Sequence, residues 1–166
     1  MRHKKELLVY ELFFEYPDKR FTLREIESKT KIPRATVQRY ITEMKKEGLL
    51  NEKNEVINTL FYKTIKSNYF VEKIVSSGLV DELINSFNPS CIILFGSIRK
   101  GDSNKESDID IFVESHVKKT LSLDKYEKKF GHKIDLFVES GINKLQKNLF
   151  NNVVNGIKLY GSLKIK

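Results

Sequence analysis

The feature that most constrains this chain is a stretch at residues 91–113, where a glycine turn separates two strand-like runs. The first run, Cys91–Phe95, is entirely apolar, as expected of a buried strand. It ends at Gly96-Ser97, where backbone amides and a hydroxyl can approach a phosphate closely. In the second run, residues 108–113, Asp108 and Asp110 alternate with Ile109 and Ile111. The stretch therefore predicts a strand, a glycine turn, a short connecting segment and a second strand.

Three carboxylates are expected to meet beside this turn. Asp108 and Asp110 are two residues apart on one strand, so both point to the same face of the sheet. Another β-rich run, residues 133–138, carries Asp135, which joins them if the two strands are neighbours. Adjacent carboxylates repel each other unless a cation lies between them, and hard oxygen ligands suit Mg²⁺. Beside a phosphate-binding turn, they predict a two-metal site for phosphoryl or nucleotidyl transfer.

These residues resemble the signature of a known family. Gly96-Ser97, ten further residues and Asp108-Ile109-Asp110 are similar to the GSx₁₀DxD motif of minimal nucleotidyltransferases, in the DNA polymerase β superfamily. The resemblance implies a small α/β domain with a mixed β-sheet, two Mg²⁺ ions, and ATP or another NTP as substrate. It also implies two sets of site residues: Gly96, Ser97 and Lys100 at the nucleotide, and Asp108, Asp110 and Asp135 as catalytic metal ligands.

One position departs from the family pattern. Lys100 stands where the family often has arginine, which keeps the positive charge but loses a bidentate fork. Minimal nucleotidyltransferases are commonly paired with small helical HEPN proteins. The resemblance therefore implies an antitoxin that transfers AMP from ATP to a tyrosine of a HEPN-type ribonuclease toxin. A hypothesis of another class stays open: a DNA-binding transcriptional regulator whose nucleotidyltransferase-like domain senses nucleotide or is inactive.

The N-terminal part has the pattern of a small helical domain. Helices are expected at residues 3–16, at residues 22–28 after a capping box, and from Pro33 to Gly48. Leu49-Leu50 and residues 56–65 then predict a β-hairpin around a polar turn. The inner face of the third helix is predicted to carry three apolar residues, Val37, Ile41 and Met44.

This arrangement resembles a winged helix–turn–helix domain, in which the third helix enters the major groove of double-stranded DNA. The candidate DNA contacts are Arg34, Thr36, Gln38 and Arg39 on the helix, and Lys53 on the wing. Arginine and glutamine can read base edges bidentately, and a lysine on the wing can contact a phosphate. Winged helices commonly bind two-fold sites as dimers, so a homodimer is one expectation. A role as a protein-interaction or dimerisation module stays open as well.

The expected fold is α+β, with a winged helix–turn–helix domain at residues 1–65, a linker helix at residues 66–78 and a minimal nucleotidyltransferase domain at residues 79–166. In the last domain, helices are expected at residues 79–87, 121–130 and 142–154, and a final strand at residues 157–160.

Composition indicates the kind of partner and the cellular compartment to expect. The formal net charge of +8 favours an anionic partner such as nucleic acid without establishing one. The sequence contains no apolar run long enough for a membrane span and no signal-peptide pattern at its start, so a cytoplasmic protein without a membrane partner is expected. Cys91 is the single cysteine and is expected to be a core thiol. The three histidines lack ligand spacing and are expected at the surface.

Overall fold

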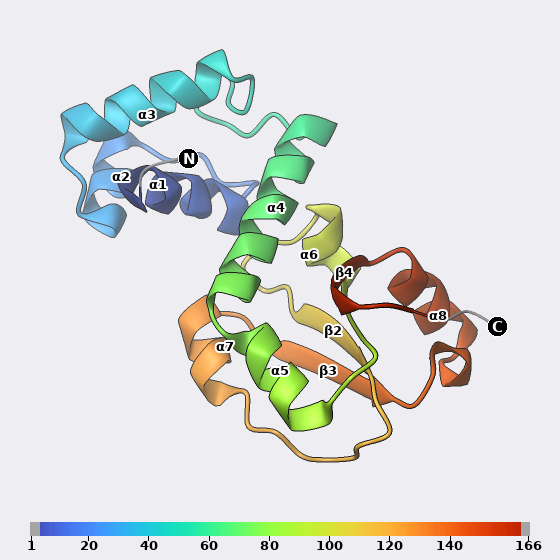
Figure 1. The fold of residues 1–166 in the computed structure, drawn as a ribbon. Coiled ribbons are helices and arrows are strands. Elements are labelled where there is room, and N and C mark those ends of the chain that lie inside the picture. Colours follow the sequence, from blue (N-terminus) through green and yellow to red (C-terminus); the bar gives the residue numbers. More distant parts are fainter. Residues whose placement is uncertain (1–3, 164–166) are drawn as a thin grey trace. The chain divides into compact units, whose positions relative to one another are not determined.

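A computed structural model describes residues 4–163 of the chain (Figure 1). The described residues form eight α-helices, one short 3₁₀ helix and four strands. The chain divides into two compact units, Met1–Thr64 and Ile65–Lys166. Within residues 4–163, no helix combines the length and the apolar character needed to cross a membrane. His3, one of the histidines expected at the surface, lies outside the described residues.

The first unit is built on three helices, α1 (Lys4–Glu15), α2 (Leu23–Thr30) and α3 (Arg34–Lys46). Their apolar faces form a common core, with these buried side chains: Val9, Phe13 and Phe14 from α1, Ile26 from α2, and Val37, Ile41 and Met44 from α3. The predicted inner face of the third helix is therefore confirmed. The capping box is also confirmed, because the Thr22 hydroxyl accepts from the Glu25 amide at 3.2 Å while the Thr22 amide donates to the Glu25 carboxylate at 2.8 Å.

The predicted β-hairpin is wrong in both arms, because residues 49–65 contain no strand. Leu50 and Val56 form one isolated antiparallel bridge, and the chain turns helical at Leu60. The sequence from residue 56 is rich in β-branched and aromatic residues, which favours a strand by local propensity. Thr59 overrides that preference, because its hydroxyl accepts from the Tyr62 amide at 3.2 Å and its carbonyl from the Lys63 amide at 3.0 Å.

Helix α4 (Leu60–Ser76) differs accordingly from the linker helix predicted at residues 66–78. It begins six residues earlier than predicted. Its first residues belong to the first unit, and the part from Ile65 onward belongs to the second.

The second unit contains a mixed four-stranded sheet, as expected. Its strands are β1 (Cys91–Phe95), β2 (Ile109–Glu114), β3 (Ile134–Glu139) and β4 (Ile157–Gly161), in the spatial order β3-β2-β1-β4. Strand β1 runs antiparallel to β2 and to β4, whereas β2 and β3 are parallel. The glycine turn predicted after β1 is the start of a short helix, α6 (Gly96–Lys100).

Helices cover both faces of this sheet. On one face, a core cluster joins the sheet to η1 (Ile142–Lys144) and α8 (Lys147–Val154); its buried members are Cys91, Ile93, Phe95, Phe112, Ile142 and Val153. Helices α5 (Leu79–Phe87) and α7 (Asp124–Phe130) lie on the other side of the sheet (Figure 1). The single helix predicted at residues 142–154 is therefore two, interrupted at Leu145-Gln146. Cys91 is a buried free thiol, as predicted, and burial raises its pKa.

Candidate functional site

The register of the sheet brings two of the predicted acids together. Asp110 on β2 is the direct partner of Asp135 on the parallel strand β3, and Phe95 at the end of β1 is the antiparallel partner of Asp110. Side chains alternate between the two faces of a sheet, so Asp110 and Asp135 project from the same face, next to each other. This face is also the one that carries Phe95 and Phe112 toward α8.

Asp110 packs directly against the turn that follows β1. Gly96 has a φ of +75°, and a Cβ atom added to it would overlap Oδ2 of Asp110 and lie 2.7 Å from its Cγ. Only glycine satisfies both the positive φ and this close approach. The glycine that the sequence placed at a phosphate-binding turn is therefore also the residue that makes room for the carboxylate.

The carboxylates are coupled electrostatically. The pKa of Asp110 is raised from 3.8 to about 6, first by burial of the side chain and then by the negative charges of Asp135 and Asp108. Asp108 is half-buried and directly precedes β2, while Asp135 is exposed. Like charges at this proximity disfavour ionisation of the most buried member.

These three residues fit a divalent cation by their chemistry, although they do not converge into a formed cluster. Within residues 4–163, no group of three His, Cys, Asp or Glu side chains lies close enough together to hold a metal ion. The donors are all carboxylate oxygens, the ligands that Mg²⁺ prefers. The repulsion that raises the pKa of Asp110 is also one that a cation between the carboxylates would relieve.

The residues predicted to contact a nucleotide lie in and around α6. Gly96 and Ser97 are its first two residues and are half-buried, and Lys100 is its last residue and is exposed. The Ser97 carbonyl accepts a hydrogen bond from the Asp102 amide at 3.0 Å, which closes the turn after the helix. Gly96 is thus in contact with Asp110, whereas the structure gives Lys100 no contact with the carboxylates.

The burial of two polar residues, His132 and Lys66, was not predicted from the sequence. His132 is 5% exposed, so its predicted surface position is wrong, and its Nδ1 lies 2.6 Å from the Ser107 carbonyl oxygen. Lys66 is 1% exposed and donates from Nζ to the Ser103 carbonyl. A signal for Lys66 was available, because it lies in an i, i+4 series of buried side chains on α4 that also contains Tyr62, Phe70 and Ile74.

In the first unit, Arg34, one of the predicted DNA contacts, forms an ion pair with Glu27. The Arg34 guanidinium donates to Glu27 Oε2 on α2 from Nε at 3.1 Å and from Nη2 at 2.8 Å. The backbone amide of Arg34 donates to the other carboxylate oxygen of Glu27. This hydrogen bonding lowers the pKa of Glu27. Arg34 therefore ties α3 to α2, a role that sequence spacing did not indicate.

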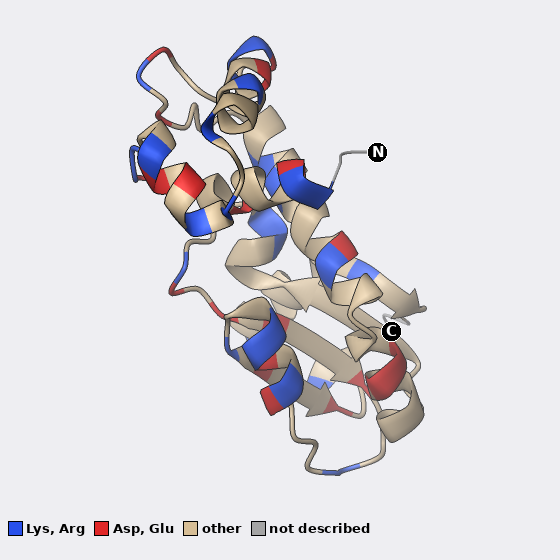
Figure 2. Cartoon of the chain, turned by 90° about the vertical axis from the view of Figure 1, so that its left-hand side faces the viewer, with Lys and Arg blue, Asp and Glu red and all other residues tan. Residues whose placement is uncertain are grey.

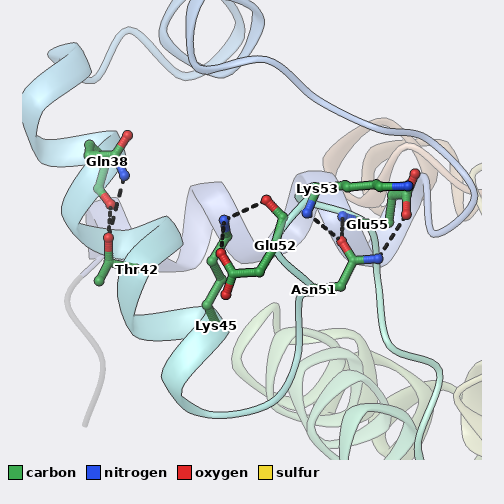
Figure 3. Close-up of polar contacts among 7 residues, drawn as sticks. All are labelled: Gln38, Thr42, Lys45, Asn51, Glu52, Lys53 and Glu55. Carbon is green, nitrogen blue, oxygen red and sulfur yellow. Dashed lines mark hydrogen bonds and ion pairs between the residues drawn. The ribbon is translucent and has the colours of Figure 1, made fainter.

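The other predicted DNA contacts remain open to solvent to different degrees. Gln38 is exposed, with its amide 3.4 Å from the Thr42 hydroxyl, and Lys53 is exposed on a turn organised by the Asn51 side chain (Figure 3). Arg39 is exposed and lies over the Tyr40 ring at 5.3 Å, and Thr36 is half-buried. Charges of both signs occur on these helices (Figure 2): α2 carries two basic and two acidic residues, whereas α3 carries four basic residues and one acid, Glu43.

Comparison with known proteins identifies the second unit. A family model described as nucleotidyltransferase domain matches residues 76–159. The match extends from the last residue of α4 into β4 and contains Gly96, Asp108, Asp110 and Asp135. A search of curated proteins finds no match. Because the family model covers just over half of the chain and all of its site-bearing strands, this chain belongs to the nucleotidyltransferase domain family.

Proposed function

We propose that this protein transfers a nucleotidyl group from ATP, or from another NTP, to a hydroxyl group, with Asp108, Asp110 and Asp135 as the acidic residues of the site. The observation that carries the proposal is the position of Asp110, which packs against Gly96 and pairs in register with Asp135. Membership of the nucleotidyltransferase domain family supports the general activity. An acid held at a glycine turn suits a reaction in which a triphosphate must lie close to the backbone.

Each residue has a specific role in the proposed reaction. Asp108, Asp110 and Asp135 would hold Mg²⁺, which when bound supplies positive charge to the triphosphate and to the developing transition state. The Ser97 hydroxyl and the amides after Gly96 orient the β- and γ-phosphates. Lys100 adds a positive charge near them.

The chemical step is an in-line displacement. Asp135, the more exposed of the paired acids, accepts the proton of the acceptor hydroxyl. The acceptor oxygen bonds to the α-phosphorus as the bond from that phosphorus to the bridging oxygen breaks, and pyrophosphate leaves. The chain's own contribution is position and charge at fixed atoms.

The proposed acceptor is a tyrosine hydroxyl of a HEPN-type partner protein, as the resemblance to minimal nucleotidyltransferases implies. The exposure of Asp135 supports a protein acceptor, because a hydroxyl on a partner's surface can reach it.

A second proposed function is binding of double-stranded DNA by the first unit, in the manner of a winged helix–turn–helix domain with a reduced wing. The observation that favours it is the division of α3 into two faces: Val37, Ile41 and Met44 are buried, while Gln38 and Arg39 are exposed. Exposed arginine and glutamine on a helix can read base edges in the major groove. A homodimer would present two such helices to a two-fold site. If the second unit only senses nucleotide, the protein is a regulator rather than an enzyme.

Calorimetry of ATP binding, with and without Mg²⁺, tests the first proposal. We expect binding by the wild type that requires Mg²⁺ and that is lost in Asp110→Asn, whereas Gln38→Ala/Arg39→Ala binds normally. The same two variants are then compared for affinity to duplex DNA, where the opposite pattern is expected. Transfer that survives Asp108→Asn/Asp110→Asn would show that the carboxylate site is not the one proposed.

A further inference from the structure

Helix α4 carries two adjacent buried polar residues that contact the segment between β1 and β2. Lys66 is 1% exposed and Ser67 is 6% exposed. Lysine is almost never buried to this extent unless its ammonium group is bonded, because removing the charge from water is unfavourable. The position of Lys66 is therefore explained by what its side chain contacts.

Both residues bond to backbone carbonyls on either side of one bend. The Lys66 ammonium donates to the Ser103 carbonyl, and the Ser67 hydroxyl donates to the Arg99 carbonyl at 2.9 Å. Between these carbonyls lies Gly101, which ends α6 with a φ of +74°. The last-turn carbonyls of a helix have no partner within the helix, so Ser67 also caps α6. One turn of α4 thus fixes the chain before and after the bend.

A second anchor holds the other end of the same segment. The His132 Nδ1 lies 2.6 Å from the Ser107 carbonyl, and the Ile109 amide donates to the Lys133 carbonyl at 2.9 Å. The imidazole packs edge-on against Phe70 of α4, with ring centroids 5.6 Å apart. Asp108 therefore lies between two backbone anchors.

We propose that Lys66, Ser67 and His132 are positioning residues, which hold residues 97–108 so that the glycine turn and Asp108 stay in place beside Asp110. This inference rests on the proposed function of the carboxylates. In this proposal the three residues act through the Arg99, Ser103 and Ser107 carbonyls rather than on the reacting atoms.

The segment needs anchors for two physical reasons. Residues 101–108 contain no helix or strand, so regular hydrogen bonding does not fix them. Asp108 and Asp110 are also like charges two residues apart, and they repel each other when no cation lies between them. Groups that orient a metal's ligands typically change metal affinity 10- to 100-fold when they are removed.

The test compares Lys66→Met with Lys73→Met, the same change two turns further along α4. Hydrogen exchange of the full-length, metal-free chain is measured over residues 97–108 and over the four strands. Mn²⁺ affinity is measured by electron paramagnetic resonance. For Lys66→Met we expect faster exchange confined to residues 97–108 and roughly 10-fold weaker Mn²⁺ binding. Lys73→Met is expected to match the wild type in both.

A merely structural role predicts a different result. Leu83→Ala creates a cavity at a buried position of α5. If Lys66 has only a structural role, Leu83→Ala would weaken Mn²⁺ binding as much as Lys66→Met does when the two variants lose the same Tm. Unchanged exchange at residues 97–108, or faster exchange throughout the sheet, overturns the proposal. If Lys66→Met does not fold, Ser67→Ala is judged by the same criteria. Wild-type protein that binds no Mn²⁺ would count against the carboxylate site, while the exchange measurement alone then decides whether the segment is held by these residues.

Discussion

The carboxylate of Asp110 occupies the space that a side chain at position 96 would need, so Gly96 and Asp110 are tied to each other sterically. The contact joins the residue directly after β1 to the second residue of β2. Sequence motifs usually place such residues near each other because both meet the ligand. Here they also constrain each other directly.

The first prediction concerns Gly96→Ala. The new methyl group overlaps Asp110 Oδ2, so the carboxylate must move from its present position next to Asp135. The positive φ adds about 1–2 kcal/mol of backbone strain. We expect loss of Mg²⁺-dependent ATP binding in calorimetry and a lower Tm.

Gly48→Ala is the control that distinguishes the effect of backbone strain from the effect of displacing the Asp110 carboxylate. Gly48 has a φ of +73°, close to that of Gly96, but a Cβ there would meet nothing within 4 Å. Both alanine variants should lose similar stability from backbone strain, and only Gly96→Ala should lose nucleotide binding. Equal binding by the two variants would contradict a role for the Gly96–Asp110 contact.

The second prediction concerns stability and pH. The folded-state pKa of Asp110, about 6, lies above its ordinary value of 3.8, so the folded protein holds this proton more tightly than the unfolded chain does. Its contribution to the free energy of unfolding is therefore fully present below about pH 4 and is lost as pH rises through 6. Asp110→Asn should stabilise the metal-free protein at pH 7.5 by on the order of 2 kcal/mol, and by much less at pH 4.

Urea unfolding at both pH values, in the presence of a chelator, provides the measurement. Asp81→Asn, an exposed change in the first turn of α5, serves as the control and should show no such gain at pH 7.5. A loss of stability in Asp110→Asn at pH 7.5 would mean that the buried carboxylate is not the unfavourable group inferred here.

The third prediction concerns the ion pair between Arg34 and Glu27. Glu27→Gln removes a negative charge beside α3 and weakens the bonds that hold the Arg34 guanidinium. If the first unit binds DNA, affinity for duplex DNA should rise, and the slope of log affinity against log salt should steepen by about one. Fluorescence anisotropy over a series of salt concentrations measures both.

Glu25→Gln is the matched control, because it removes the same charge from the same helix while glutamine can still complete the capping box with Thr22. An equal rise in the two variants would mean that net charge, rather than release of Arg34, governs binding. No DNA binding in any variant would remove the proposed second function.

The fourth prediction concerns Ser103, whose side chain is 1% exposed. Its hydroxyl has no hydrogen-bond partner among the described residues, although its carbonyl accepts from Lys66. An unsatisfied buried hydroxyl is unfavourable, so Ser103→Ala should raise the free energy of unfolding by up to about 1 kcal/mol. Urea unfolding measures it.

Ser115→Ala is the contrasting variant. Ser115 is also buried, but its hydroxyl donates to the Phe87 carbonyl and accepts from the Val117 amide. The free energy of unfolding of this variant should fall by about 1 kcal/mol or more. Destabilisation of both variants by similar amounts would show that the Ser103 hydroxyl is bonded in solution.

The parts of the fold that could be predicted from sequence are those governed by periodicity. The apolar face at Val37, Ile41 and Met44 was correct, because burial of one face of a helix dictates that pattern. The strand after Asp108 was also correct, although its residues from Ile111 to Val113 are buried on both faces of the sheet. The sequence does not specify which strands are neighbours. The position of Asp135 beside Asp110 could therefore be predicted only on the assumption that β3 pairs with β2.

The errors arise where one specific contact, local or tertiary, outweighs composition. Thr59 begins a helix in a stretch with strand propensity, and His132 is buried because Ser107 and Phe70 provide partners distant in sequence. Arg34 could not be known to pair with Glu27, because seven residues and a turn separate them. Tertiary partners of this kind leave no periodic trace.

The parallel pairing of β2 and β3 also determines where the chain can change in length. Side chains alternate on a strand, so removal of one residue between Gly131 and Ile134 would turn Asp135 to the opposite face and bring Leu136 beside Asp110. The exposed loop at residues 116–120 lies ahead of α7, where added residues leave the register of β3 unchanged. Insertions are thus tolerable on one side of α7, whereas a single deletion on the other side dismantles the site.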